Sequence, residues 1–216
     1  MTHRATRLAI VIAVLIGGIA FGAGQASAVL ITNPGFEDPV ASAVCCINTV
    51  TGWSISGSGA GVWNINDFPL GFWTVSAPQG KQIAFVSPAP NPGSFAMISQ
   101  SLGVGLEADK EYTLSGYVGH PLGFPATYTV ALLAGGNLLA STSDTGPLGS
   151  FASFQVLFDS AGSPYVGQTL EIQLSSSDAQ TGFDDIALIV PEPSTLLLLG
   201  FGLVGLGGAS WRRRRP

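Results

Sequence analysis

The chain has 216 residues, of which 46% are hydrophobic and only 10% are charged. This apolar content is too high for a disordered chain, and the length fits one domain with accessory segments. Between residues 29 and 190, two lysines stand against twelve carboxylates, a net charge of −10. That balance excludes a nucleic-acid-binding protein, which needs a basic face to displace counterions from phosphates.

The N-terminus has the three parts of a secretory signal peptide. Arg4 and Arg7 form a basic start, residues 8–21 form an apolar run, and Ala26-Ser27-Ala28 is a small-residue cleavage site. The sequence therefore predicts an N-terminal signal helix within residues 1–28, which signal peptidase removes after Ala28. A retained membrane helix is the alternative, but the apolar run is short for that role.

The only two cysteines, Cys45 and Cys46, are adjacent in the sequence. Export favours oxidation, so the one intramolecular disulfide available is a vicinal bond between these neighbours. Consecutive Cα atoms lie about 3.8 Å apart, below the usual disulfide range of roughly 4.4–6.8 Å, so such a bond would be strained. A vicinal disulfide, two free thiols and intermolecular crosslinks are all open at this point.

Aromatic residues are dense between residues 53 and 73, where they lie among glycines and prolines. Aromatic faces stack on the C–H surfaces of sugars, so Trp63, Phe72 and Trp73 are candidates for a glycan-binding platform. Packing in the core is the alternative, and it is the commoner role of a large aromatic residue. The segment 68–73 is the exception, because an exposed apolar loop of that size would mark a contact surface.

Alternation of apolar and polar residues predicts strands in the central region. Residues 112–118, 153–158 and 170–175 alternate in this way, and the turn Gly135-Gly136 inside 128–142 predicts a hairpin. No stretch of this region keeps a helical period. Many short strands with glycine and proline turns predict an all-β domain over residues 29–190, an antiparallel sandwich of two sheets.

Motifs of catalysis are missing from the sequence. His120, the only histidine of the central region, lies between Gly119 and Pro121 in an expected turn, and neither a nucleophile elbow nor a zinc-protease motif is present. Asp184 and Asp185 cannot act as a pair, because neighbouring residues of a strand point to opposite faces. The sequence therefore predicts that this protein is not an enzyme.

The C-terminus combines a proline motif, an apolar run and a basic cluster. Pro191, Glu192 and Pro193 separate the last strand from an apolar run at 195–211, which is just long enough to span a bilayer as a transmembrane helix. The basic cluster that follows consists of Arg212, Arg213, Arg214 and Arg215. Because such clusters stay on the cytoplasmic side, residues 29–190 are expected outside the inner membrane.

Residues 191–216 resemble the PEP-CTERM sorting signal of Gram-negative bacteria. The resemblance implies that an exosortase-type processing protease recognises the Pro-Glu-Pro site, removes the helix and passes the protein to the cell surface. The helix would then be only a transient membrane anchor. Exosortase systems accompany exopolysaccharide production, so the resemblance also implies a biofilm or sheath setting.

Two motifs frame the central domain, Asn33-Pro34-Gly35-Phe36-Glu37 at its start and Phe183-Asp184-Asp185-Ile186-Ala187-Leu188 at its end. They resemble the jelly-roll modules of the galactose-binding-like superfamily, which includes many carbohydrate-binding modules. The resemblance implies a jelly-roll β-sandwich whose first and last strands lie side by side.

The same resemblance implies a structural calcium ion (Ca²⁺) near Glu37, Asp184 and Asp185, as in many relatives. Ca²⁺ takes six to eight oxygen ligands, which carboxylates and backbone carbonyls supply. Strand alternation places Asp184 on the face of Ile186 and Leu188, pointing inward, and Asp185 outward. In the alternative, the carboxylates only accept backbone amide hydrogens. No other cofactor is expected.

The sequence as a whole predicts an exported, non-catalytic surface protein that binds an extracellular polysaccharide. A neutral glycan is favoured over an anionic one, because the domain has almost no basic residues. The alternative is a structural component of the surface or matrix that binds protein rather than glycan.

Overall fold

The computed structural model describes residues 26–191, except 43–44, 58 and 89–93. The predicted signal helix, the predicted transmembrane helix, Glu192, Pro193 and the four terminal arginines lie outside these residues. Within the described part of the chain, no helix has the length and apolar character needed to cross a membrane. Residues Ser27–Val190 form one compact unit.

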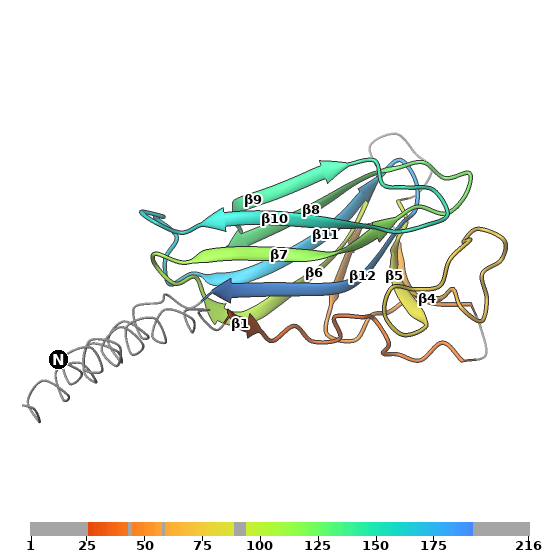
Figure 1. Ribbon diagram of the computed structural model, residues 1–216, viewed down its shortest axis with the longest axis horizontal. Helices are drawn as coiled ribbons and strands as arrows, with labels where there is room; N and C mark the ends of the chain where they lie inside the picture. The colour runs from red at the N-terminus through yellow and green to blue at the C-terminus, as the bar shows by residue number, and fades with distance from the viewer. Residues whose placement is uncertain (1–25, 43–44, 58, 89–93, 192–216) are drawn as a thin grey trace, which may run out of the picture. The chain divides into compact units, whose positions relative to one another are not determined.

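The described residues form two facing β-sheets (Figure 1). The larger sheet has the order β10 (Ala152–Asp159), β7 (Glu111–Gly119), β12 (Thr181–Pro191), β5 (Gln82–Val86), β4 (Ala60–Asn64) and β2 (Cys46–Ile47), and β1 (Ala26–Val29) also pairs with β12. The smaller sheet has the order β3 (Ser54–Gly57), β6 (Phe95–Gly105), β11 (Thr169–Ser177), β8 (Thr127–Ala134) and β9 (Asn137–Asp144). Antiparallel registers join the strands of both sheets. The predicted all-β jelly-roll sandwich is confirmed.

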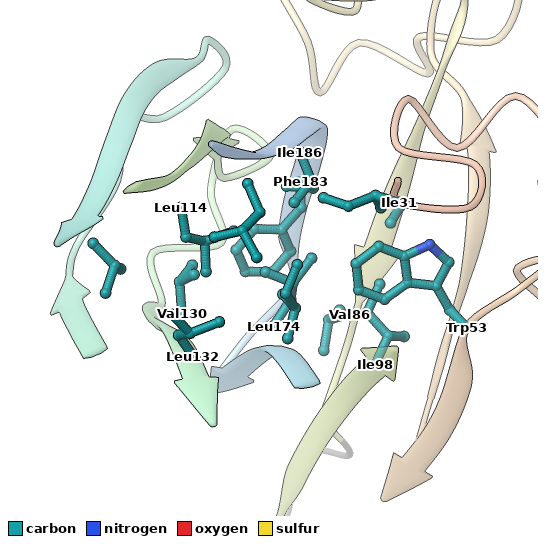
Figure 2. Close-up of a cluster of buried hydrophobic side chains, with 14 of the residues drawn as sticks. Ile31, Trp53, Val86, Ile98, Leu114, Val130, Leu132, Leu174, Phe183 and Ile186 are labelled. Atoms are coloured by element: carbon teal, nitrogen blue, oxygen red, sulfur yellow. The ribbon is translucent and has the colours of Figure 1, made fainter. Parts of the chain in front are cut away.

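The space between the sheets is filled by the apolar members of the alternating strands (Figure 2). Leu114, Val130 and Leu174 are fully buried there, and Trp53 closes one side of the core. Trp53 satisfies its indole N–H by donating to the backbone oxygen of Thr32 at 3.1 Å. Burial of each such aliphatic side chain stabilises the fold by about 1.5–3 kcal/mol.

This core is complete within the compact unit. Its buried members run from Ile31 to Val190, and both sheets contribute to it. A fragment of residues 27–190 therefore contains every described element that closes the core, and it is the natural unit for experiments on the domain.

A β-bulge in β12 decides where Asp184 points. The register shifts between Asp184 and Ala187, and Asp185 has a φ of 51°. The extra residue lets Phe183, Ile186 and Leu188 all face the core. Asp184 thus lies on the outer face of the larger sheet, so the prediction that it points inward with Ile186 is wrong. Sequence alternation alone does not reveal the inserted residue.

Candidate functional site

Asp184 is a carboxyl group on the outer face that is nevertheless fully buried. Its Oδ2 accepts a hydrogen bond from the backbone N–H of Gln79 at 2.7 Å, and its Oδ1 accepts one from the N–H of Asp185 at 2.8 Å. Gln79 belongs to the connection between β4 and β5, residues 65–81, which lies against this face. The connection, rather than the core, removes Asp184 from water.

Burial raises the pKa of Asp184 to about 8, and the negative charges of Asp185 and Glu37 act in the same direction. The two amide hydrogen bonds favour the ionised form but do not outweigh burial. A pKa in this range favours the protonated form of the carboxyl at neutral pH. A protonated carboxyl in a protected position is the form that can donate a proton to a substrate.

Glu37 and Asp184 bind the same short segment of backbone. Glu37 Oε1 accepts hydrogen bonds from the N–H groups of Lys81 and Gln82, both at 2.7 Å, two and three residues beyond the Gln79 N–H that binds Asp184. Asp185 is exposed. In the described residues, no group of three or more His, Cys, Asp or Glu side chains converges on one point, and calcium binding by Glu37, Asp184 and Asp185 stays a prediction.

Five rings form an aromatic cluster beside the start of β12: Trp63, Phe72, Trp73, Phe124 and Phe151. Trp73 and Phe151 stack with ring centroids 4.6 Å apart, and Trp63 meets Phe72 and Trp73 edge-on. Trp63 and Trp73 are only 4% and 6% exposed, whereas Phe72 is half-buried and Phe124 is exposed. Phe72 is therefore the least buried residue of the predicted glycan platform, and glycan binding by this set stays a prediction.

Trp73 connects the aromatic cluster to Asp184. Its ring lies over Gly182, where an added Cβ would come within 3.0 Å of Trp73 Cη2. Gly182 and Asp184 share one strand face and are about 6.6 Å apart along β12. The indole Nε1 of Trp73 is buried and is the one buried side-chain polar atom of the described residues without a hydrogen-bond partner. Such an unpaired buried donor is unusual in a folded domain.

The other side of Asp184 is polar. Tyr117 of β7 lies directly opposite Asp184 in the sheet, on the same face, and is 37% exposed. Ser153 of β10 lies opposite Tyr117 in turn. The carboxyl thus stands between an aromatic region and a hydroxyl-bearing one. Sequence reasoning missed Tyr117, although its place on the polar face of an alternating strand was readable.

His120 is excluded from this chemistry by its hydrogen bonds. Its Nε2 accepts from the backbone N–H of Gly146 at 3.0 Å, so Nδ1 carries the proton and faces the oxygens of Gln180 and Thr181. Burial lowers its pKa. A neutral, fully buried imidazole with both nitrogens engaged holds the surrounding loops together.

The cysteines are free thiols in the structure and are both half-buried. Burial, together with the hydrogen bond and charge interaction with Cys45, raises the pKa of the Cys46 thiol to about 12. Cys46 lies opposite Trp63 in the sheet, so the pair packs against the aromatic cluster. The vicinal disulfide stays a prediction.

Two of the predicted processing residues, Ala28 and Pro191, lie within the described part of the chain. Ala28 is exposed in β1, and Pro191 is the last residue of β12. Cleavage after Ala28 would leave Val29 as the only residue of β1 in the mature chain. That cleavage stays a prediction.

Comparison with known proteins identifies two regions. The profile of the HpiC1-like family, described as HpiC1 cyclase, matches residues 27–189, and the PEP-CTERM protein-sorting motif matches residues 190–215. The predicted sorting motif is therefore confirmed, and it implies export, association with the cell surface of a Gram-negative bacterium and processing by exosortase-type machinery. No curated protein matches the chain.

Solved structures similar to this chain include cyclases. A Stig cyclase, Fisc from Fischerella sp. TAU, in complex with (3Z)-3-(1-methyl-2-pyrrolidinylidene)-3H-indole is 28% identical with a TM-score of 0.70, and the match covers 78% of this chain and 100% of that one. A cyclase from the same organism in complex with 4-(1H-indol-3-yl)butan-2-one is 27% identical with a TM-score of 0.68, covering 77% and 99%. TmCBM61 with β-1,4-galactotriose is 18% identical with a TM-score of 0.51, covering 73% and 95%, and shares the fold.

These comparisons correct one prediction. The matches to HpiC1 cyclase and to Stig cyclases point to a cyclase, so the expectation that this protein is not an enzyme is wrong. The expectation rested on familiar motifs of hydrolases and metal enzymes. No local sequence pattern marks a single buried carboxyl beside an aromatic cluster. Its pKa depends on a loop whose position in the fold cannot be predicted from the sequence.

Proposed function

This chain belongs to the HpiC1-like cyclase family, and from that premise we propose that it is an exported cyclase with Asp184 as its proton donor. Its substrate is neutral and largely apolar and contains an indole-like ring. The observation that carries the proposal is the protonated, buried carboxyl of Asp184 beside the aromatic cluster. The ligands of the Fischerella cyclase structures are indoles, which supports the substrate class.

Proton donation at this position can start a ring closure. Asp184 gives its proton to one carbon of a C=C bond, and a second π bond of the substrate attacks the resulting cation and forms the new C–C bond. Loss of a proton from the ring back to the Asp184 carboxylate restores the acid, so atoms and charge balance without a further reactant. General acid catalysis of this kind contributes about 10²- to 10⁴-fold.

The charges of the domain favour a neutral substrate. Among the described residues the only basic side chains are Lys81 and Lys110, which pair with Asp67 and Glu107. A substrate activated by loss of a diphosphate needs cations to hold the leaving group. Both lysines are already paired with carboxylates, so no unpaired cationic side chain of the described residues could hold a diphosphate near Asp184. A cyclisation that begins with protonation does not need such a cation.

The aromatic cluster suits the cationic stage of this reaction. The face of a tryptophan or phenylalanine ring attracts a positive charge within about 6 Å, and the attraction is stronger where water is excluded. Trp73 is buried and lies along β12 from Asp184. Its free N–H can also orient a substrate acceptor. Because the 65–81 connection covers Asp184, the substrate enters when this connection opens.

The binding step tests this proposal without knowledge of the natural substrate. In calorimetric titrations of residues 27–190, we expect saturable binding of 4-(1H-indol-3-yl)butan-2-one and none of β-1,4-galactotriose. Replacing Trp73 by Phe keeps a ring but removes the N–H donor, and should weaken indole binding about fivefold, the worth of one hydrogen bond. Binding of the trisaccharide alone would overturn the proposal.

Glycan binding is the second candidate function, and the exposure of Phe124 beside the half-buried Phe72 favours it. In this form the domain would tie the exported protein to exopolysaccharide in a biofilm. The fold it shares with carbohydrate-binding modules is compatible with the role. The other non-catalytic role is that of a structural matrix component, in which the domain binds protein instead of glycan.

Calcium at Glu37 and Asp184 is a separate proposal about stability. The ion would be held by Glu37, by backbone carbonyls and by the ionised form of Asp184. Ca²⁺ and the proton therefore compete for Asp184. Only a domain without bound calcium at this site could donate the Asp184 proton. We expect 1 mM-scale Ca²⁺, chosen because extracellular sites bind at roughly 0.1–1 mM, to raise the melting temperature, and more so at pH 8.5 than at pH 6. Glu37→Gln should weaken the response. Equal melting temperatures in Ca²⁺ and in chelator would contradict the proposal.

A further inference from the structure

One short motif occurs three times in the domain. Pro-Leu-Gly stands at residues 69–71, 121–123 and 147–149, each time with a phenylalanine one or two positions later. We call these three turns the Pro-Leu-Gly tips. In each, the glycine has a positive φ, which a turn of this kind requires, and the leucine is exposed.

Hydrogen bonds tie the three tips into one surface. The N–H of Leu122 donates to the oxygen of Phe72 at 2.9 Å, and the N–H of Thr74 donates to the oxygen of Gly149 at 2.9 Å. His120 joins the second and third tips, because its N–H donates to the oxygen of Pro147 at 2.8 Å. Loops far apart in sequence are thus fixed side by side at the end of the sandwich where β12 begins (Figure 1, right).

The surface that the tips present is apolar. Leu70, Leu122 and Leu148 are 58%, 39% and 45% exposed, and Phe124 beside them is 44% exposed. Exposed apolar groups gathered at one place mark an interaction surface rather than ordinary scatter. The phenylalanines that follow the tips make ring contacts within the aromatic cluster.

No charged residue lies in the Pro-Leu-Gly tips themselves. Residues 68–80, 112–143 and 145–158 contain no Asp, Glu, Lys or Arg, in a domain whose net charge is −10. Asp67 and Asp144 stand at the base of the first and third loops. Moving the tips out of water therefore strips no charged group of its hydration.

We infer that the Pro-Leu-Gly tips dock the domain on an uncharged lipid surface, with the three leucines inserted at the interface. The tips are projecting turns without a polar side chain. A fluid bilayer accepts such turns without a matching shape, whereas a protein partner needs complementary shape and about one hydrogen bond per 100–200 Å². The carboxylates at the base of the loops disfavour anionic lipids.

The tips and the point where the chain leaves the domain toward the tail lie at opposite ends of β12. The chain continues toward the tail from Val190 near the end of β12, an 11-residue strand of about 35 Å, whereas the tips lie at its beginning. The domain can therefore hold to lipid through the tips after the tail has been removed. Apolar molecules dissolved in the bilayer would meet the aromatic cluster directly behind the tips, a consequence that rests on the proposed function.

Vesicle flotation tests the inference. The probes are vesicles of phosphatidylcholine alone and vesicles with added phosphatidylglycerol, mixed with residues 27–190 to remove any contribution of the tail. We expect binding to the neutral vesicles and weaker binding to the anionic ones at low salt. Leu70→Ser with Leu122→Ser and Leu148→Ser should weaken partitioning about 100-fold or more, because burial of one leucine is worth about tenfold.

A matched control separates the tips from general apolarity. Leu138 of β9 and Leu157 of β10 are 58% and 65% exposed but lie away from the tips, so Leu138→Ser with Leu157→Ser should bind vesicles like the unchanged domain. Asp184→Asn should also bind normally, which separates this inference from the cyclase proposal. A circular dichroism melt checks that the triple variant is folded.

Two results would overturn the inference. The first is absence of wild-type binding to neutral vesicles, or equal binding by the triple variant. The second is a dimer of the wild-type domain that the triple variant reduces to a monomer while neither binds vesicles, because the tips would then join two copies of this chain.

Discussion

Replacing Asp184 by Asn should lower the rate of cyclisation about 10²- to 10⁴-fold and leave the affinity for ligand within a few-fold of the wild type. The Asn side chain has the size of the carboxyl and can occupy the same place under Gln79, but it has no acidic proton to donate. The assay follows ring closure of an indole that carries an unsaturated side chain, by chromatography and mass spectrometry. Binding of 4-(1H-indol-3-yl)butan-2-one to the same variant reports whether the site is intact.

Asp185→Asn is the matched control for this substitution. Asp185 is the neighbouring carboxylate and is exposed at the bulge, so its replacement should leave turnover near the wild-type rate. If Asp184→Asn turned over as fast as Asp185→Asn, the proton would come from another group, and the assignment of Asp184 would be wrong.

The same carboxyl should govern how stability changes with pH in calcium-free buffer. The pKa of Asp184 is raised from 3.8 to about 8 in the fold, so the unfolded chain releases this proton first as the pH rises. The stabilising effect is fully present below pH 3.8 and is lost as the pH rises through 8. Since one pKa unit corresponds to about 1.4 kcal/mol, the loss amounts to roughly 6 kcal/mol.

The effect of Asp184→Asn on the free energy of unfolding should change sign across this pH range. Its amide group leaves one of the two N–H donors, of Gln79 or Asp185, without an acceptor, which costs about 1–3 kcal/mol. The variant should therefore be less stable than the wild type at pH 4 and more stable at pH 8.5, in urea unfolding of residues 27–190. Parallel stability curves for the two proteins would mean that Asp184 is not held neutral.

Patterns of local residues predicted the fold well. Alternation along 112–118, 153–158 and 170–175 corresponds to β7, β10 and β11, and the Gly135-Gly136 turn joins β8 to β9. These patterns reflect one buried and one open face of each strand, a local property. The jelly-roll resemblance supplied the rest, because its two framing motifs lie at opposite ends of the chain.

The site was harder to predict, because it depends on groups that meet only in the folded domain. One extra residue in the bulge moves Asp184 to the outer face, and the 65–81 connection then buries it. The same connection turns Trp73 inward, onto Gly182. Neither event leaves a period or a motif in the sequence, so the pKa of the carboxyl and its aromatic neighbours became apparent only with the structure.

A direct titration of Asp184 tests the central claim of a neutral buried acid. Residues 27–190, labelled with ¹³C at aspartate carboxyls and kept free of calcium, are followed by NMR from pH 4 to pH 9, and Asp184→Asn identifies the signal. We predict a midpoint near 8. A carboxyl that is already ionised at pH 5 would contradict the account, because it would have no proton to donate at neutral pH.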